Sequence, residues 1–397
     1  MNRRDLVKLG ILFSPFLLSG CGNKKADGTN APYLEITPKK TGLYSFSAPL
    51  PFNYDVIDEI AELNNKYTQA KITSLYNCVP RPIVDEFNNC MQAGRGHNYD
   101  IKSYEDFAKY AKYAMKKGFH ICYLLNSPKP FTEKDYREIE PNFKKLLDFL
   151  EDIGIKEIKF GNTQVASLVN KYKKFRLSAS TCLEYHNITQ YKNLVHNYPN
   201  IDLFDIAEDE NHNFAFLKNL KTMFPTRNIE LMVNEFCFKG CPARISHPGG
   251  DFCNFDCPKI FRERTLFQNF YHSAIIYPWN LPYYSALGIN NFKFSSTPQP
   301  RAIFSDLGFV KFYLDCVEYG VENVTAQDFI DNMIIFKFDK DIKIKEDLMV
   351  KDIMPYLLDV GQFIKHGHEC AVRCGTVCKY CDQQAEKAEK FLSKYKV

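Results

Sequence analysis

The chain has 397 residues, of which 45% are hydrophobic and 25% are charged, and its net charge is +4. This composition excludes intrinsic disorder as the default state, and the length is enough for one large barrel or two ordinary domains. So small a net charge indicates no particular nucleic-acid or membrane partner. The fourteen cysteines are unusually many for a cytosolic protein and call for an explanation.

The first 21 residues, MNRRDLVKLGILFSPFLLSGC, have the features of an export signal. The apolar stretch 9–19 is too short to span a bilayer, and the paired arginines before it resemble a twin-arginine signal. The end of this segment resembles a lipobox, in which Cys21 is lipidated, and residues 22–42 are typical of a polar linker. We therefore expect an exported, membrane-anchored lipoprotein that faces the periplasm or the cell exterior. The alternative is an uncleaved N-terminal helix, which would leave the protein cytoplasmic.

Export affects how the cysteines are interpreted. An oxidising compartment favours disulfides, but lipidation of Cys21 leaves thirteen cysteines, an odd number that cannot pair completely. The twin-arginine route carries proteins that are already folded, often with a cofactor inserted. A metal site that is assembled in the cytoplasm fits that route.

From residue 43 onward, short β-rich runs alternate with longer helical patterns, which is typical of βα units. The predicted strands are Tyr44–Leu50, Ile72–Tyr76, His120–Leu125, Ile155–Phe160, Arg176–Thr181, Leu203–Ala207, Ile229–Asn234 and Asn291–Ser295. The predicted helices include Tyr54–Lys66, Tyr104–Lys117, Asp135–Ile153 and Thr163–Lys173. This order predicts an α/β fold, a TIM-barrel-like (β/α)8 domain over residues 43–340, with an open doubly wound sheet as the alternative. A small Cys-rich C-terminal region, 341–397, follows.

In such a barrel, chemistry takes place where the strands end and the loops begin. Asn126 and Thr181 come at two of these ends and are predicted to contact substrate. Glu208, Asn234 and Glu235 come at two others and are candidate catalytic residues, and either glutamate could serve as an acid or a base. The alternative for each carboxylate is a salt bridge at the barrel end.

Two cysteine pairs with identical spacing follow the seventh strand. Cys237, Cys241, Cys253 and Cys257 lie within 21 residues, and the turn-forming residues 248–250 separate the pairs. A cubane cluster needs four thiolates and tolerates varied spacing, whereas zinc sites usually show closer pairs. The pattern therefore favours a [4Fe–4S] cluster over zinc, with disulfides as a further alternative.

Four other residues bear on this cysteine site. Arg244 and His247 lie between the pairs and could offset the cluster charge or hydrogen-bond its sulfurs, although a surface cation and a loop histidine would look the same. Cys78 and Cys90 follow the second strand on the same face of the barrel. Either of these two thiols could replace one member of the first group.

A second dense group consists of Cys370, Cys374, Cys378 and Cys381. Its last three members match the radical S-adenosylmethionine signature superficially, but that signature belongs just after the first strand of its barrel. Here the group precedes a predicted final helix, Gln383–Lys394. We therefore expect an auxiliary or structural second cluster, with zinc as the alternative.

Four segments, in this order, resemble the peptidase U32 family of collagenase-like proteins. They are YLLNS (123–127), SAST (178–181), ELMVNEFCFKGCPARISH (230–247) and NLPYYSALGINNFKF (280–294). The third segment is the most specific, and the likeness extends over roughly residues 43–340. The resemblance implies a barrel-like α/β domain and, as in several members, an oxygen-sensitive [4Fe–4S] cluster.

The resemblance also implies site residues. It makes Cys237, Cys241 and Cys257 cluster ligands, with Cys253 as the expected fourth and Cys90 or Cys78 in its place as alternatives. Relatives tend to read Lys-Ile-x-Gly-Arg after the last strand. This chain has KFSST at 293–297, and its nearest arginine is Arg301, so Arg301 is the candidate substrate contact and the substrate is expected to differ.

Together with the cysteine groups, the resemblance implies an iron–sulfur enzyme of redox or hydroxylation type that acts on a small or aromatic substrate with the help of an electron-transfer partner. The best understood members of the family that the chain resembles hydroxylate aromatic rings without molecular oxygen. A U32-type peptidase is the second hypothesis, although no Gly-x-Ser-x-Gly or His-Glu-x2-His motif is present. The third is a non-catalytic electron-transfer or sensor protein.

Overall fold

The computed structural model describes residues 34–79, 101, 103–130, 132–172, 175–234, 263–295, 307–333, 343–357, 361, 364 and 379–396. The chain divides into two units, Met1–Tyr33 and Leu34–Val397, and every described element belongs to the second. Within these ranges, no helix has the length and apolar character needed to cross a membrane.

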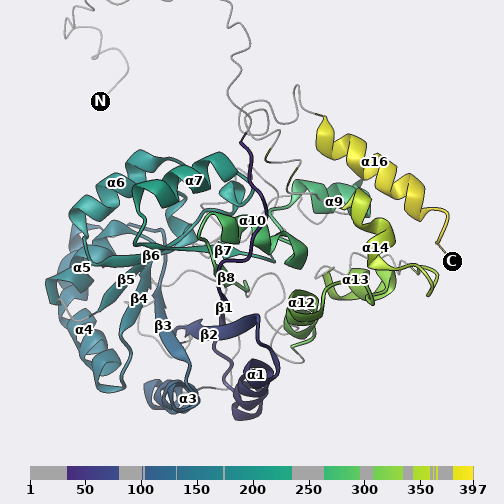
Figure 1. Ribbon diagram of the computed structural model, residues 1–397. Coiled ribbons are helices and arrows are strands. Elements are labelled where there is room, and N and C mark those ends of the chain that lie inside the picture. Colours follow the sequence, from purple (N-terminus) through teal and green to yellow (C-terminus); the bar gives the residue numbers. More distant parts are fainter. Residues whose placement is uncertain are drawn as a thin grey trace, which may run out of the picture. The chain divides into compact units, whose positions relative to one another are not determined.

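Parallel strands close into an eight-stranded barrel in chain order (Figure 1). The strands are β1 (Tyr44–Pro49), β2 (Ala70–Asn77), β3 (His120–Leu125), β4 (Glu157–Phe160), β5 (Arg176–Ala179), β6 (Ile201–Asp205), β7 (Asn228–Met232) and β8 (Asn291–Lys293). Each strand pairs with the next, and β8 also pairs with β1, where Phe46 lies opposite Phe292. The predicted (β/α)8 barrel is therefore confirmed, and the open doubly wound sheet is wrong because β1 and β8 join.

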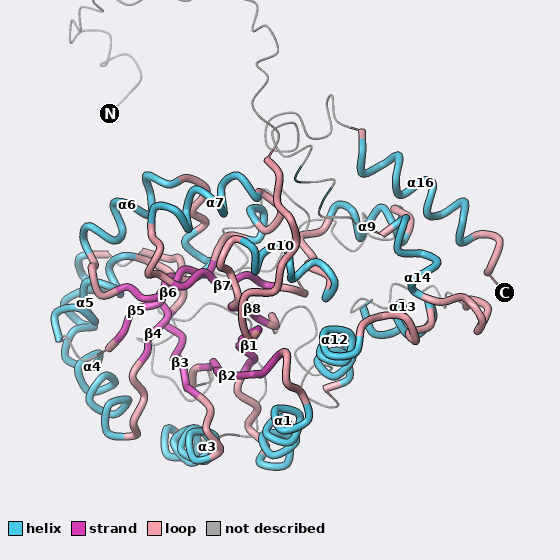
Figure 2. Tube along the Cα trace, in the orientation of Figure 1, coloured by secondary structure: helices cyan, strands magenta, loops and turns pink. Residues whose placement is uncertain are grey.

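Helices surround this ring of strands, as Figure 2 shows. They are α1 (Tyr54–Lys66), α3 (Tyr104–Lys116), α4 (Glu133–Asp152), α5 (Thr163–Tyr172), α6 (Ile188–Asn197), α7 (Phe214–Met223), α9 (Leu266–His272), α10 (Leu281–Ala286) and α12 (Gly308–Tyr319). The side chain of Ser103 caps α3 by accepting a hydrogen bond from the Asp106 amide, as an N-cap residue should. Phe107, Ala111 and Ala114 then face the sheet at helical spacing and are buried.

The main apolar core lies between the outer face of the sheet and the helices. Phe46, Ile158, Phe204 and Phe292 are fully buried there, on strands that lie far apart in the chain. Since successive side chains of a strand point to opposite faces, the intervening residues point into the barrel. The outward face of each strand therefore packs against the helices, and the inward face lines the interior of the barrel.

The sequence prediction extends several strands too far at their carboxyl ends. The predicted fifth strand includes Ser180 and Thr181, but Ser180 caps a 3-10 turn over Thr181–Leu183 and accepts a hydrogen bond from the Cys182 amide. The predicted sixth strand includes Ala207, which precedes a second 3-10 turn over Glu208–Glu210. The Ser180 and Ile206 amides still bond to the neighbouring strands, at Phe160 and Glu230. Beyond them, the Leu183, Glu184 and Glu210 amides find partners within the turns, so the sheet ends there.

The C-terminal region packs on the segment between β7 and β8. It contains α13 (Ala326–Met333), α14 (Val350–Ile353), the 3-10 turn Met354–Tyr356 and α16 (Tyr380–Leu392), and α16 lies against α9. Nε2 of His272 in α9 is 2.9 Å from Oδ1 of Asp382, and the Phe267 amide donates a 3.1 Å hydrogen bond to Glu389. The predicted final helix is therefore present, although it begins three residues earlier than expected.

Gly161 follows β4 at a point where two loops approach each other closely. A Cβ atom added there would lie 2.0 Å from the main-chain oxygen of Asn126, far inside van der Waals contact. The Gly161 amide also donates a hydrogen bond to the Leu125 carbonyl, at 3.3 Å. Glycine is therefore required for the main chain after β3 and β4 to adopt this arrangement.

We expect Gly161→Ala to lower the free energy of unfolding by about 1–3 kcal/mol, because the methyl group displaces the main chain of Asn126. Urea denaturation measures the change. Gly42→Ala is the matched control, since its added Cβ would have its nearest neighbour at 3.4 Å, and its effect should stay within about 0.5 kcal/mol. Equal effects of the two substitutions would contradict the close approach.

Candidate functional site

Four charged side chains meet inside the barrel, and all four are buried. Nζ of Lys159 lies 2.6 and 2.8 Å from the two carboxylate oxygens of Asp205 and 2.7 Å from Oε2 of Glu230. Nζ of Lys293 lies 2.9 Å from Oδ2 of Asp205. Ser47 completes the set by donating a 2.7 Å hydrogen bond to Oε1 of Glu230. We call Lys159, Asp205, Glu230 and Lys293 the ionic layer.

The ionic layer lies toward the carboxyl ends of its strands. Lys293 is the last residue of β8 and Asp205 the last of β6, while Lys159 and Glu230 come one and two residues before the ends of β4 and β7. The layer therefore lies below the end of the barrel at which sites of this architecture are found. We call this carboxyl end the barrel mouth.

Burial and ion pairing shift the pKa values of the two carboxyl groups of the layer in opposite directions. Burial alone would raise the pKa of Asp205, but the ammonium groups of Lys159 and Lys293 hold it well below its usual range. Burial raises the pKa of Glu230 to about 7, and the Asp205 carboxylate adds to the rise, while Lys159 opposes it. The layer thus contains a permanent anion, two cations and one carboxyl group that titrates near neutral pH, a property common at functional sites.

The opposite side of the barrel interior is apolar. Tyr76, Cys122 and Leu124 form a small buried cluster that is separate from the main core, and Cys78 packs against it half-buried. Nζ of Lys293 lies over the Tyr76 ring, 4.5 Å from its centroid, and so joins the two sides. Burial raises the pKa of the Cys122 thiol well above its ordinary value, so this thiol stays neutral.

Small residues separate the ionic layer from the barrel mouth. Two residues beyond Lys159 comes Gly161, beyond Asp205 comes Ala207, and beyond Lys293 comes Ser295. At a spacing of two, these positions follow on the same inward-facing side. Gly161, Ala207 and Ser295 therefore add little side-chain volume of their own there, and the main chain of Asn126 packs against Gly161.

Three of the predicted site residues are buried together at the mouth. Asn126 follows β3, Thr181 follows β5 and Glu208 follows β6, with exposed fractions of 9%, 7% and 7%. Nδ2 of Asn126 lies 3.8 Å from the sulfur of Cys182, beside Thr181. Burial raises the pKa of the Cys182 thiol to about 11, and the charge of Glu208 adds to this rise. Asn126 thus contacts a neutral thiol that follows Thr181 directly in the chain and that the charge of Glu208 affects.

Asn234 has a different environment. Its side-chain amide donates a 3.1 Å hydrogen bond to the Ser295 carbonyl, and its oxygen accepts a 2.6 Å hydrogen bond from the Ser295 amide. Both ends of the side chain thereby connect the exit of β7 to the exit of β8. The contacts describe a positioning residue, and the catalytic role suggested by the sequence stays a prediction.

Most of the other predicted site residues lie outside the described residues. These are Cys21, Cys90, Glu235, Cys237, Cys241, Arg244, His247, Cys253, Cys257, Arg301, Cys370, Cys374 and Cys378. Cys78 and Cys381 are described, and both are half-buried. Cys122 and Cys316 are buried in β3 and α12.

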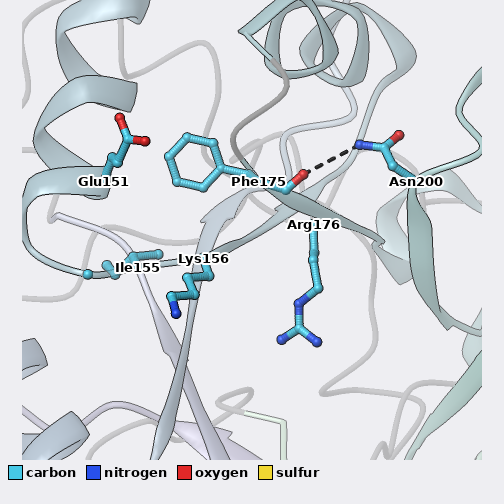
Figure 3. A pocket seen from close by; sticks show the side chains of 7 residues that line it. Glu151, Ile155, Lys156, Phe175, Arg176 and Asn200 are labelled. Atoms are coloured by element: carbon cyan, nitrogen blue, oxygen red, sulfur yellow. Dashed lines mark hydrogen bonds between the residues drawn. The ribbon is translucent and has the colours of Figure 1, made fainter.

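A cavity of about 460 Å³ lies at the opposite end of the barrel from the mouth (Figure 3). Glu151, Lys156, Phe175 and Arg176 line it, close to the amino ends of β4 and β5. Figure 3 shows the Lys156 and Arg176 side chains extending away from the Phe175 ring. In this architecture, that end of the barrel usually contributes stability rather than chemistry.

A charge cluster on the inward side of β3, β4 and β5, at their amino ends, lies beside this cavity. Oε2 of Glu157 lies 2.7 Å from Nε2 of His120 and 3.3 Å from the Arg176 guanidinium. Burial alone would raise the pKa of Glu157, but hydrogen bonds from His120 and Ser178 lower it to about 2.

Sequence reasoning missed the ionic layer. A signal was present, because each of the predicted strands four, six, seven and eight carries at least one charged residue among apolar neighbours, as in EIKF, LFDI, IELMV and NFKF. Lys, Asp and Glu are almost never fully buried unless they are paired. Charges inside four predicted strands of one barrel therefore indicate mutual pairing in its interior, although not which groups pair.

No family model matches the chain, and no curated protein shows significant similarity to it. Similar solved structures include the U32 peptidase Mk0906, with a TM-score of 0.43 and 10% identity over 67% of this chain and 97% of that chain. CdNal from Clostridium difficile, in complex with mannosamine, has a TM-score of 0.35 and 14% identity over 89% of this chain and 99% of that one. A GH113 β-1,4-mannanase has a TM-score of 0.36 and 10% identity over 70% of this chain and 99% of that chain. At these values, the likenesses carry no argument about function.

We expect Lys159→Met to lower the free energy of unfolding by about 3–5 kcal/mol, because it leaves the Glu230 carboxylate buried without a cation in direct contact. Urea denaturation at neutral pH measures the loss. Lys144→Met is the control, since Lys144 forms an exposed ion pair with Asp148 and should contribute less than about 0.5 kcal/mol. A loss as small as that of the control would show that the ionic layer does not hold the barrel together.

We expect the contribution of Glu157 to be present above its unfolded pKa of about 4.5 and to disappear as the pH falls toward 2. Glu157→Gln should therefore cost up to about 3 kcal/mol at neutral pH, and this cost should shrink progressively below pH 4.5. Urea denaturation across the acidic range measures the difference. The exposed Glu386→Gln serves as control, and a pH-independent cost for Glu157→Gln would contradict the assigned pKa.

Proposed function

We propose that the chain is a U32-like iron–sulfur enzyme of redox or hydroxylation type, with a [4Fe–4S] cluster bound at the barrel mouth by Cys237, Cys241, Cys253 and Cys257. One observation carries this proposal. The strands are all parallel, and β7 ends at Met232, so the chain leaves the sheet at the mouth shortly before Cys237. The same end holds Asn126, Thr181 and Glu208.

The chemistry of the available donors fits such a cluster. Thiolates are the ligands that iron–sulfur clusters require, and four of them lie within one loop sequence. The other described thiols compete poorly, because burial raises the pKa of Cys182 to about 11 and that of Cys316 to about 12. Cys78 is half-buried beside the barrel interior, which supports it as the alternative fourth ligand. When bound, a cluster of this kind supplies one-electron chemistry.

The described residues can bind and orient a substrate beneath that loop. In this proposal, Asn126 and Thr181 contact the substrate, and Glu208 accepts or donates a proton at the mouth. The ionic layer forms the polar floor, and because its four charges are buried, it excludes bulk water from that side. Asn234 keeps the exits of β7 and β8 in register by its two hydrogen bonds to Ser295.

The second cysteine group, Cys370, Cys374, Cys378 and Cys381, is proposed to hold an auxiliary cluster or zinc. Cys381 lies in the first turn of α16, and α16 packs on α9, which follows Cys257 in the chain. This packing supports a short path between the two groups, as transfer to an electron-carrier partner would require. Export and a lipid anchor at Cys21 belong to the same proposal and rest on the sequence of residues 1–21.

Anaerobic purification of the full chain should yield about four irons and four sulfides per cluster, with visible absorption that bleaches on reduction. Cys241→Ala should lose about four irons per chain, because it removes a thiolate ligand. Cys316→Ala is the matched control, since this free, buried thiol belongs to α12 and its loss should leave the iron content unchanged. Zinc without iron, or equal iron in both variants, would contradict the proposal.

A further inference from the structure

We propose that Asp205 and Glu230 form one buried proton-binding site, in which a single proton is shared between the two carboxyl groups and is lost as the pH rises. The site is a pH-sensitive switch in the wall of the barrel, because loss of the proton places two negative charges side by side on neighbouring strands. It goes beyond the proposed function, and testing it requires neither iron nor a substrate.

The register of β6 and β7 brings the two carboxyl groups together. Asp205 lies directly opposite Glu230 in the parallel pairing of these strands, and both side chains point into the barrel, where both contact Lys159. Asp205 is 2% exposed and Glu230 is 5% exposed. Like charges directly opposite each other on neighbouring strands are destabilising, and salt screens buried charges little. This arrangement therefore favours a state in which one of the two groups is neutral.

The hydrogen bonds of the pair also require a proton. Asp205 and Glu230 hydrogen-bond each other. Two ionised carboxylates have acceptor atoms only, so a bond between them needs a proton on one of the two. This bond lowers the pKa of Asp205 and raises that of Glu230, so the proton resides mainly on Glu230. Oε1 of Glu230 accepts a hydrogen bond from Ser47 in addition, as a carboxylic acid can.

The groups around the pair determine how strongly it holds its proton. Among the described residues, these groups are Lys159 on β4, Lys293 on β8, Ser47 on β1, Cys122 on β3, Tyr76 on β2 beneath Lys293, and Tyr191 on α6. Both ammonium groups contact Asp205 and keep it ionised. Burial is the largest cause that raises the pKa of Glu230 to about 7, and the charge of Asp205 adds to it. The pair therefore loses its proton around neutral pH.

Charge balance does not oppose a proton on the pair. With the proton bound, the ionic layer has two ammonium groups and one carboxylate. Glu157 supplies a further negative charge, since it lies two residues before Lys159 on β4 and the Lys159 ammonium helps to lower its pKa. Both lysines therefore keep a nearby anion when Glu230 is neutral.

Loss of the proton affects the carboxyl ends of β6 and β7. Asp205 is the last residue of β6, and the Ile206 amide donates a 3.1 Å hydrogen bond to the Glu230 carbonyl. Repulsion between two ionised carboxylates opposes this pairing directly below the barrel mouth. The stabilisation that the proton provides is present in full below the unfolded pKa of Glu230, about 4.5, and is lost as the pH rises through about 7.

Infrared spectroscopy of the full chain tests for the shared proton, because a carboxylic acid absorbs at a higher carbonyl frequency than a carboxylate. We expect an acid band that persists above about pH 6, where surface carboxyl groups are ionised, and that titrates near pH 7. Glu230→Gln should remove this band. Glu59→Gln is the matched control, because Glu59 also contacts a lysine, Lys311, but on the outer surface, and it should leave the band unchanged.

Asp205→Asn separates a shared proton from one that belongs to Glu230 alone. The substitution removes the neighbouring negative charge and leaves both ammonium groups to Glu230. The titration of the acid band should therefore move at least one pH unit lower.

Urea denaturation measures the effect of the proton on stability. Glu230→Gln resembles the protonated carboxyl group in shape and charge and does not titrate. The unfolding equilibrium constant of the unmodified chain, divided by that of Glu230→Gln, should rise about tenfold per pH unit between about pH 4.5 and 7 and level off above that range.

Absence of an acid band above about pH 6, an equal band in Glu230→Gln, or an unchanged titration in Asp205→Asn would overturn the shared site. A ratio of unfolding constants that does not vary with pH would overturn the switch. The infrared titration of the unmodified chain needs no variant, so it remains decisive if a substitution prevents folding.

Discussion

The barrel depends on the mutual neutralisation of four charges in its interior. Moving a carboxylate or an ammonium out of water costs several kcal/mol, and the cost is offset only when partners and hydrogen bonds are arranged well. Here Asp205 receives both lysines, Lys159 contacts both carboxylates, and Ser47 satisfies a remaining oxygen of Glu230. Since the four residues come from β4, β6, β7 and β8, their pairing requires those strands to hold one register around the barrel.

This requirement also gives the interior its chemical character. Apolar residues usually fill the interior of such a barrel in layers. In this chain the interior is divided instead, with charges on one side and Tyr76, Cys122 and Leu124 on the other. Among the described residues, Lys293 contacts one carboxylate, that of Asp205, and burial raises the pKa of Glu230 to about 7. A carboxyl group with such a raised pKa suits proton transfer more than it suits packing.

Hydrogen bonds between asparagine side chains and main-chain groups connect the loops at the barrel mouth, above the ionic layer. Asn162 donates hydrogen bonds to the carbonyls of Ser127 and Lys129 and caps α5 by accepting from the Val165 amide. Asn211 donates to the carbonyls of Met232 and Ala274, and Asn234 binds Ser295 at both its ends. These side chains connect successive loops at the barrel mouth, while the turn that contains Cys182 is also held by Ser180.

The sequence alone determined the alternation of strands and helices, because hydrophobic periodicity is local and each βα unit shows it independently. It also located the cysteine groups and the polar residues Asn126, Thr181 and Glu208 at strand ends. It could not determine which of those residues are positioning groups, as Asn234 is by its contacts with Ser295, because such hydrogen bonds depend on where neighbouring loops lie. Only the tertiary structure decided that Lys159, Asp205, Glu230 and Lys293 meet. Closure of the barrel brings together charges from strands that are distant in the chain, and the inward or outward direction of each side chain depends on the register of the whole sheet.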